Sequence, residues 1–240
     1  MSLLGACGLL AIPALVYGVP FAMRKHAIAR LRERCEEERT LVLSFDDGPG
    51  SATTPRLLDL LREREARATF FPLGLRVQGR EEILDRVAAE GHELGCHSFS
   101  HRHAWKIVPG AGWRDARAGF AALAPWVEPT GLYRPPHGKL DLLTLAALRR
   151  HRALLAWWTV DSGDTWQALP DPEQIEREVA DAGGAVVLLH DFDRGAERVR
   201  FVLDVTERLV ARARREGFAI RTLGELIGAP AHPGAVTRRP

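Results

Sequence analysis

Residues 40–50 read TLVLSFDDGPG, an apolar run that ends in two aspartates, a glycine and a proline. Because the run is short and bounded by turn residues, it predicts a buried strand over residues 41–45. Two adjacent carboxylates followed by Gly-Pro are poor strand material, so the chain should turn there. Alone, such aspartates indicate only a polar turn. A functional interpretation requires a second group of chemically active side chains at the same place.

The same alternation continues along the chain, where short apolar runs are separated by amphipathic stretches. Further strands are predicted over residues 68–73, 92–96, 132–134, 154–160, 186–190 and 218–221. Helices are predicted over residues 54–65, 81–90, 115–123, 140–150, 172–182 and 197–216, the first with Thr54 as N-cap and Pro55 at its first position. Alternating strands and helices favour a parallel sheet with functional groups at the strands' carboxyl ends. We expect an α/β fold, a barrel one strand short of eight.

Residues 1–39 differ in composition from the rest of the chain. Residues 3–23 are uncharged and mostly apolar, a run that is long enough to cross a bilayer as a helix. We therefore predict a hydrophobic membrane-anchor helix over residues 1–23 and a short charged linker helix over residues 24–39. A catalytic domain over residues 40–228 and a flexible tail over residues 229–240 complete the expected organisation.

Composition excludes several classes of protein. The 33 basic and 31 acidic side chains leave a net charge of +2, which gives no electrostatic reason to expect a nucleic-acid partner. The three cysteines, Cys7, Cys35 and Cys96, cannot form a disulfide framework. With 46% hydrophobic residues the chain can bury one substantial core, and we expect a monomer with a single catalytic domain.

A second polar cluster follows the strand predicted over residues 92–96. Residues 97–101 read HSFSH, and two histidines four positions apart can share one face of a helical turn and bind one cation. On its own, such a pair is more often two surface or core histidines. With one aspartate from the end of the first strand, His97 and His101 would form a two-histidine, one-carboxylate metal site with positions open for water and substrate.

Three more motifs follow later strands: RPPHG at residues 134–138, DSGD at residues 161–164 and LLHD at residues 188–191. The two prolines hold the backbone rigid after Arg134, whose guanidinium can grip a carboxylate through two hydrogen bonds. Each motif alone is compatible with a structural turn or a structural arginine. Five polar motifs at the carboxyl ends of five predicted strands are not readily produced by chance, and together they indicate an active site.

In this order, FDDGP, HSFSH, RPPHG, DSGD and LLH resemble the polysaccharide deacetylases of the fourth carbohydrate esterase family, the NodB-homology domain. The resemblance covers residues 40–221, most of the chain. It implies a distorted seven-stranded (β/α) barrel and one divalent metal ion, zinc before cobalt, nickel or manganese. The implied reaction is hydrolysis of N-acetyl groups on an amino-sugar polysaccharide or oligosaccharide, of the peptidoglycan or chitin type, with release of acetate.

The resemblance also implies roles for individual residues of the first three motifs. The metal-ligand positions of the family fall on Asp47, His97 and His101. The general base falls on Asp46, and the residue that orients this base falls on Arg134. Asp46 would remove a proton from water bound to the metal.

The remaining roles fall on the later motifs. The general acid falls on His190, which would be paired with Asp164, and the apolar wall for the acetyl methyl group falls on Leu188. The backbone N–H of His137 would donate a hydrogen bond to the oxyanion. Thr165 departs from the family pattern, which has tryptophan directly after this aspartate, and this departure puts the shape of the substrate groove in question.

Three alternatives stay open. A glycoside hydrolase would pair Asp46 with another carboxylate, but neighbouring strand residues project to opposite faces, so Asp47 is a poor partner. Such an enzyme would also leave HSFSH unexplained. A catalytically silent glycan-binding domain is disfavoured by the intact Asp46 and His190. A deacetylase of a smaller amino-sugar conjugate or glycolipid is our second choice.

Two arguments about location conflict. Basic residues follow the apolar run and none precedes it, which by the positive-inside rule places the catalytic domain in the cytoplasm. Most glycans that such enzymes cut lie outside the membrane. On that ground we expect a bacterial membrane protein with a single N-terminal anchor and an extracytoplasmic catalytic domain.

Overall fold

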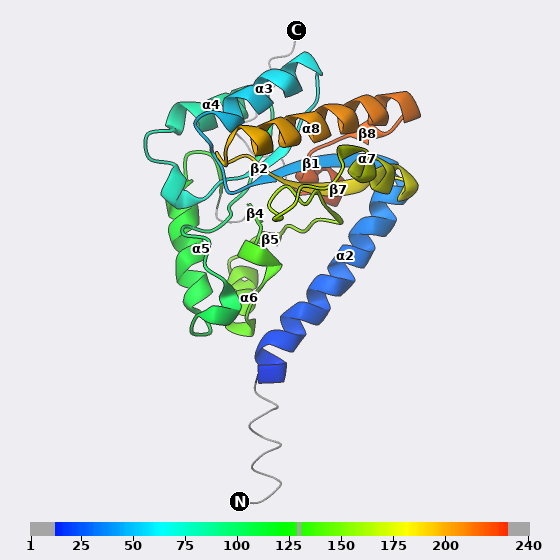
Figure 1. Ribbon diagram of the computed structural model, residues 1–240. Coiled ribbons are helices and arrows are strands. Elements are labelled where there is room, and N and C mark those ends of the chain that lie inside the picture. Colours follow the sequence, from blue (N-terminus) through cyan, green and yellow to red (C-terminus); the bar gives the residue numbers. More distant parts are fainter. Residues whose placement is uncertain (1–12, 129–130, 230–240) are drawn as a thin grey trace, which may run out of the picture.

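The computed structural model describes residues 13–128 and 131–229 of the chain. A central parallel sheet is covered by helices on both sides, and one long helix runs along its flank (Figure 1). The strands are β1 (Thr40–Asp46), β2 (Thr69–Phe71), β3 (Glu93–Leu94), β4 (Leu132–Tyr133), β5 (Leu154–Leu155), β6 (Val160–Asp161), β7 (Ala185–His190) and β8 (Ala219–Ile220).

Each of the predicted amphipathic stretches contains a helix. They are α2 (Val19–Glu37), α3 (Thr53–Glu63), α4 (Glu81–Ala89), α5 (Ala111–Ala122), α6 (Leu142–Arg150), α7 (Pro172–Asp181), α8 (Ala196–Glu216) and α9 (Leu223–Ile227). Four short helical turns accompany them: η1 (Ala14–Gly18), η2 (Gly74–Arg76), η3 (Ala104–Lys106) and η4 (Pro136–Gly138).

All the pairings between described strands are parallel, and β1 lies at their centre. It pairs with β7 from Leu41 to Asp46, with β2 through its last residues and with β8 through its first. The order in the main sheet is β3-β2-β1-β7-β6. A bridge between Cys96 and Tyr133 joins the end of β3 to the second sheet, β4-β5, from which the chain runs on into β6. The strands thus follow one another around a distorted barrel, as expected.

The side chains of β1 alternate between two hydrophobic cores, and this alternation positions the site. Leu41 and Phe45 pack with α3, α7 and α8 in one core, whereas Val42 packs with residues of α2, α5 and α6 in the other. Ser44 and Asp46 share the side of Val42, because successive strand residues point to opposite faces. Every residue of β1 is buried, and each buried leucine or phenylalanine contributes about 1.5–3 kcal/mol.

Several local expectations were wrong in detail. The run predicted as one strand over residues 154–160 splits into β5 and β6, because its middle leaves the strand pairing: the carbonyl of Trp157 accepts a hydrogen bond from the Arg134 side chain. The short helix α9 was missed. It begins with a capping box in which Thr222 and Glu225 bond each other's backbone N–H groups.

The predicted N-cap of α3 is also wrong. Thr54 lies inside the first turn, and its hydroxyl donates a hydrogen bond of 2.6 Å to the carboxylate of Asp191. The cap comes instead from Asp193, in the loop after β7. Its carboxylate accepts hydrogen bonds from the backbone N–H groups of Ser51 at 2.8 Å and Thr53 at 2.9 Å. The loop after β7 and the loop after β1 are thereby joined.

The long N-terminal helix packs against the barrel. Leu31 and Cys35 of α2 are buried in the second core, and α2 continues through the boundary that was expected between residues 23 and 24. Among the helices within residues 13–128 and 131–229, none combines the length and the apolar character that crossing a bilayer requires. Residues 1–12 of the expected anchor and residues 230–240 of the expected tail lie outside the described residues. The membrane anchor stays a prediction.

Removal of the Asp193 cap should destabilise the protein. Asp193→Ala leaves the first N–H groups of α3 without their acceptor, so we expect the free energy of unfolding to fall by about 1–2 kcal/mol in urea denaturation. Asp181→Ala, which removes an exposed aspartate at the end of α7, should change it by less than about 0.5 kcal/mol. Equal stability of the two variants would mean that the contacts of Asp193 contribute nothing net.

Candidate active site and metal centre

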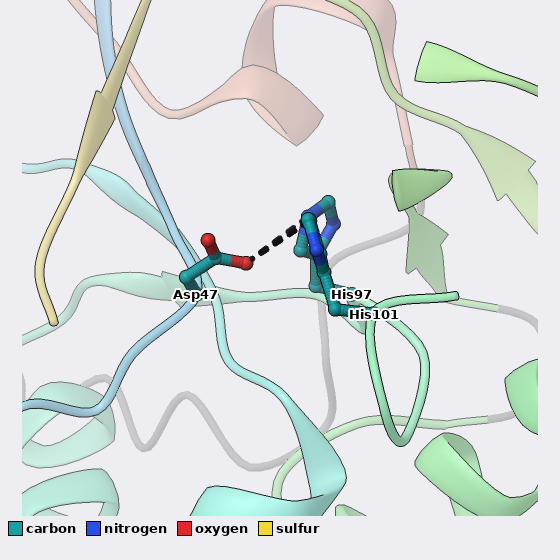
Figure 2. A group of neighbouring side chains, drawn as sticks. All are labelled: Asp47, His97 and His101. Carbon is teal, nitrogen blue, oxygen red and sulfur yellow. Dashed lines mark ion pairs between the residues drawn. The ribbon is translucent and has the colours of Figure 1, made fainter. Parts of the chain in front are cut away.

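Asp47, His97 and His101 converge at the carboxyl end of the barrel (Figure 2). The Oδ1 atom of Asp47 lies 3.5 Å from Nε2 of His97 and 3.3 Å from Nε2 of His101. One ligand atom from each residue lies within 4.8 Å of the others. This Oδ1 atom is buried without a hydrogen-bond partner, which is costly unless a cation completes the site. One carboxylate and two imidazoles therefore fit a divalent metal ion.

The loops that carry these three residues have unusual backbone. Asp47, Ser98 and His101 have φ angles of 68°, 68° and 58°, in the left-handed region that costs about 1–2 kcal/mol per non-glycine residue. At Asp47 this conformation ends the regular alternation of side chains between the two faces of β1. Asp46 Oδ2 therefore also approaches His97, 3.6 Å from its Nε2 atom. The expectation that the two aspartates project to opposite faces does not hold beyond the end of the strand.

The tautomer of His97 follows from its hydrogen bond. Its Nδ1 atom lies 2.7 Å from the backbone carbonyl of Arg134, which can only accept, so Nδ1 carries the proton. The lone pair of Nε2 then faces Asp47 and His101. Burial lowers the pKa of His97 to about 3, which keeps the imidazole neutral. A neutral ring oriented by a carbonyl is the usual state of a metal-binding histidine.

The HSFSH loop is held by helix α5. The carboxylate of Asp115 accepts hydrogen bonds from the hydroxyls of Ser98 at 2.7 Å and Ser100 at 2.5 Å, and from the N–H of Ser100 at 3.2 Å. The helix comes so close that a Cβ at Gly119 would lie 2.5 Å from the carbonyl carbon of Ser98. Sequence reasoning missed Asp115, since an aspartate on an amphipathic helix carries no local sign of a partner elsewhere.

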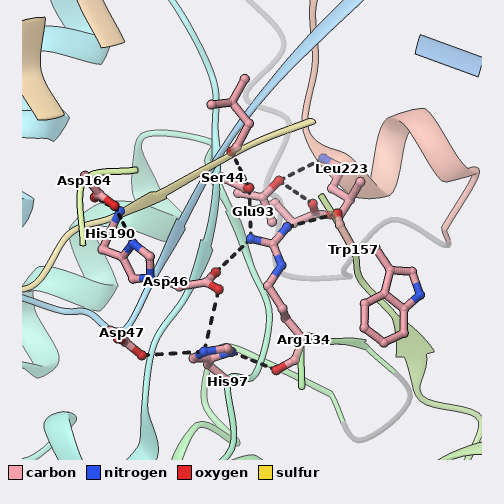
Figure 3. Close-up of polar contacts among 12 residues, drawn as sticks. Ser44, Asp46, Asp47, Glu93, His97, Arg134, Trp157, Asp164, His190 and Leu223 are labelled. Carbon is pink, nitrogen blue, oxygen red and sulfur yellow. Dashed lines mark hydrogen bonds and ion pairs between the residues drawn. The ribbon is translucent and has the colours of Figure 1, made fainter. Parts of the chain in front are cut away.

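Arg134 and Asp46 form a fully buried ion pair (Figure 3). Nη1 of Arg134 donates hydrogen bonds to Asp46 Oδ1 at 2.8 Å and to the Ser44 hydroxyl at 2.9 Å, and Nη2 donates to the carbonyl of Trp157. The expected two bonds to one carboxylate are thus divided between Asp46 and Ser44. The guanidinium also lies 4.1 Å from the ring centroid of Phe71. Burial raises the pKa of Asp46, and the charge of Arg134 opposes that shift.

His190 is paired with Asp164 on the other side of Asp46 in this view (Figure 3). Its Nδ1 lies 2.8 Å from Asp164 Oδ1, and its backbone N–H donates to Oδ2 at 2.8 Å. Burial lowers the pKa of His190, but the hydrogen bond and charge of Asp164 outweigh it and raise the pKa to about 9. Arg198 of α8 holds the Asp164 loop by donating to the backbone carbonyls of Asp164 and Trp166. The imidazole is therefore protonated at neutral pH.

The two remaining predicted residues lie at the same end of the barrel. Leu188 is buried on β7. Its neighbours Val187 and Leu189 belong to the core that contains residues of α3, α7 and α8, so alternation turns Leu188 to the interior of the barrel. His137 in η4 has a φ of 55°, and its ring centroid lies 4.4 Å from that of His101. Burial lowers the pKa of His137 to about 4.

A buried acid beside the site was not singled out from the sequence. Asp191 is bonded by Thr54, while its Oδ1 atom has no hydrogen-bond partner among the described residues. Burial raises its pKa to about 7. A methyl group at Gly48 would overlap this carboxylate, so the glycine of the Asp-Asp-Gly-Pro turn leaves the space that Asp191 occupies.

All five motifs thus meet at one end of the barrel, with an ion pair, a charged imidazole and a three-residue cluster side by side. Residues 33–154 match the model of the polysaccharide deacetylase family. The chain belongs to this family. Its relatives include peptidoglycan and chitooligosaccharide deacetylases, and it shares the parallel α/β fold of the solved family members.

Similar proteins support the assignment to the polysaccharide deacetylases. A peptidoglycan-N-acetylglucosamine deacetylase of Bacillus cereus is 33% identical over 194 residues, which cover 79% of this chain and 89% of that protein. A chitooligosaccharide deacetylase of Bradyrhizobium sp. is 32% identical over 203 residues, which cover 78% and 90%. The crystal structure of a peptidoglycan N-acetylglucosamine deacetylase has a TM-score of 0.72 at 26% identity and covers 80% of this chain and 89% of its own.

Metal binding should depend on the three-residue cluster of this deacetylase family member. We expect isothermal titration with Zn²⁺ to give one ion per chain. His97→Ala removes one of three ligands and should weaken Zn²⁺ binding by more than about a hundredfold. Loss of a group that only hydrogen-bonds a ligand costs about 10–100-fold, and loss of the ligand itself should cost more. His103→Ala, a nearby histidine outside the cluster, should keep the affinity. Undiminished binding by His97→Ala would place the ion elsewhere.

Proposed function

We propose that this protein is a metal-dependent N-deacetylase that hydrolyses acetyl groups on amino-sugar units of a bacterial cell-wall glycan and releases acetate. One observation carries the proposal. A carboxylate, Asp46, and a protonated imidazole, His190, stand next to a cluster suited to a divalent cation. An amide needs this combination, because water is a poor nucleophile and an amine is a poor leaving group. The names of the similar proteins from Bacillus cereus and Bradyrhizobium sp. support the substrate class.

Asp47, His97 and His101 would hold the metal ion, for which we propose Zn²⁺, with Co²⁺, Ni²⁺ or Mn²⁺ as alternatives. A divalent ion there would lower the pKa of a bound water and polarise the acetyl carbonyl. Members of this family depend on a metal in general, and the unpartnered oxygen of Asp47 supports the same requirement here.

Two residues would carry the proton transfers, Asp46 as the base and His190 as the acid. Asp46 accepts the proton of the attacking water, and its hydrogen bond from Arg134 keeps one carboxylate oxygen fixed while the other faces the cluster. His190 donates a proton from Nε2 to the departing sugar nitrogen, since its Nδ1 atom is engaged by Asp164. Amide hydrolysis near neutral pH requires a base that accepts the proton of water and an acid that protonates the departing amine.

Two further groups would act on the acetyl unit. The backbone N–H of His137 donates to the developing oxyanion, where a fixed donor is more effective than water. Leu188 offers an apolar wall to the methyl group, in keeping with its buried place on the interior side of β7. Both assignments are proposals that rest on position in the barrel.

The rival functions lead to different products and substrates. A glycoside hydrolase would create a new reducing end, whereas a deacetylase creates acetate and a free amine. A silent glycan-binding domain would bind without turnover. A deacetylase of a smaller amino-sugar conjugate or glycolipid remains the second candidate, and the length of the preferred substrate distinguishes it. We also propose an extracytoplasmic catalytic domain, an N-terminal anchor and a monomeric state, on sequence arguments alone.

Replacement of the base should abolish most turnover. Asp46→Asn keeps the shape but cannot accept a proton, so acetate release from N-acetylated glycan should fall by about 10²–10⁴-fold in kcat. Zn²⁺ binding should persist, because Asp46 is outside the ligand set. Asp204→Asn, on the surface of α8, serves as the control with near-normal turnover. Near-normal kcat in Asp46→Asn would remove Asp46 from the mechanism.

The pH dependence should report the acid. His190 must be protonated to act, so kcat should fall as the pH rises through about 9, the raised pKa of this residue. Asp164→Asn removes the negative charge that raises the pKa of His190. Burial of His190 remains and lowers this pKa. The descending alkaline limb should therefore move to lower pH in pH–rate profiles. An unmoved limb in Asp164→Asn would show that another group controls it.

A further inference from the structure

Four ring side chains contact one another in succession, starting at the candidate metal ligand His101. The ring centroids of His101 and His137 lie 4.4 Å apart, those of His137 and His103 lie 4.8 Å apart, and those of His103 and Trp105 lie 6.2 Å apart. We call His101, His137, His103 and Trp105 the ring row. It joins the loop after β3 to the loop after β4.

The outer part of the ring row is exposed, yet its orientation is fixed. Trp105 is 41% exposed. Its indole Nε1 donates a hydrogen bond to the carbonyl of Leu140 at 3.3 Å, and its backbone N–H donates to Nδ1 of His103 at 3.2 Å. A large aromatic side chain is thus held in place without being packed into a core. Such a preorganised surface binds flat apolar groups at little entropic cost, and the C–H face of a sugar ring is one.

Two cations border the ring row. The Nζ atom of Lys139 lies 4.0 Å from the ring centroid of Trp105, and Lys106 follows Trp105 in η3. Neither ammonium group has a carboxylate within 4.0 Å among residues 13–128 and 131–229. A ligand that stacks on Trp105 and also carries negative charge would therefore find free cations beside it.

We propose that the outer part of the ring row, His103 and Trp105, binds a saccharide unit adjacent to the one that is deacetylated, in an amino-sugar chain that carries carboxylates. The proposal rests on the proposed function, and it specifies a polymer of acidic sugars rather than a small conjugate. Three ring-to-ring contacts connect His101 to Trp105, which keeps Trp105 near enough to the metal cluster to contact a neighbouring saccharide unit.

The length of the substrate tests the stacking. Trp105→Ala should lower kcat/KM for a five-unit N-acetylglucosamine oligomer by about two- to tenfold, the range expected for one aromatic contact, and leave the two-unit oligomer unaffected. Trp105→Phe should restore most of the loss. Trp126→Ala, which removes a tryptophan whose Nε1 bonds Asp85 on another surface, should change neither. An equal loss on both oligomers, or no loss on either, would overturn the proposal.

The charge of the substrate tests the cations. Lys139→Gln should lower kcat/KM for a peptidoglycan-derived oligosaccharide with free carboxylates by about two- to fivefold, and should not affect an uncharged oligomer of the same length. Lys25→Gln, a lysine on α2 that lies over Phe21, is the matched control and should affect neither. An identical response of the charged and uncharged substrates to Lys139→Gln would overturn the acidic-chain assignment.

Binding separates this proposal from the proposed function. The Asp46→Asn protein should bind the five-unit oligomer with a change in tryptophan fluorescence, and the added Trp105→Ala replacement should weaken this binding by the same two- to tenfold, about one aromatic contact. If the wild-type protein deacetylates no glycan, the proposed deacetylase function is wrong. The binding measurement still tests the proposed saccharide subsite. Oligomer binding that is unchanged by Trp105→Ala would overturn the subsite whatever the activity.

Discussion

The buried ion pair between Arg134 and Asp46 is the constraint on which the site depends. Arg134 is fully buried, and loss of either partner from such a pair leaves an uncompensated charge that costs about 3–5 kcal/mol. The same residue acts twice: its guanidinium fixes the carboxylate of Asp46, and its backbone carbonyl fixes the tautomer of His97. The candidate base and a candidate metal ligand are therefore oriented from one point. This couples the end of β1 to the end of β4 across the barrel interior.

Around that pair, loops in costly conformations are held by acids from other elements. Asp115 on α5 binds the serines of the HSFSH loop, and Asp193 binds the first residues of α3. Asp191 fills the space beside Gly48. Each of these carboxylates accepts hydrogen bonds that would otherwise go to water, and so limits the conformations of a loop that carries a functional residue. A site held this way is preorganised, which is what electrostatic catalysis requires.

The protonation of the site is likewise a property of neighbours. Burial alone would leave His190 neutral, and Asp164 reverses this through a hydrogen bond and a negative charge. Burial alone also raises the pKa of Asp46, and Arg134 opposes that shift. Each of the two groups therefore has a partner of opposite charge that favours its charged form. Beyond them, the ring row connects the metal cluster to the exposed Trp105.

The amino-acid sequence alone determined the positions of the strands, the α/β class and the five motifs, because apolar runs, turn residues and strand ends are local features. Motifs at the ends of parallel strands meet at one edge, so the order of the motifs was enough to group His97 and His101 with one aspartate of the first strand. The choice of Asp47 came from the resemblance to the deacetylase family. Only the tertiary structure decided how they are held. The cap from Asp193, the support from Asp115 and the splitting of β5 from β6 join residues far apart in the chain. Local sequence patterns do not indicate such distant partners. Strand periodicity also does not predict the left-handed backbone at Asp47, which changes the direction of the chain.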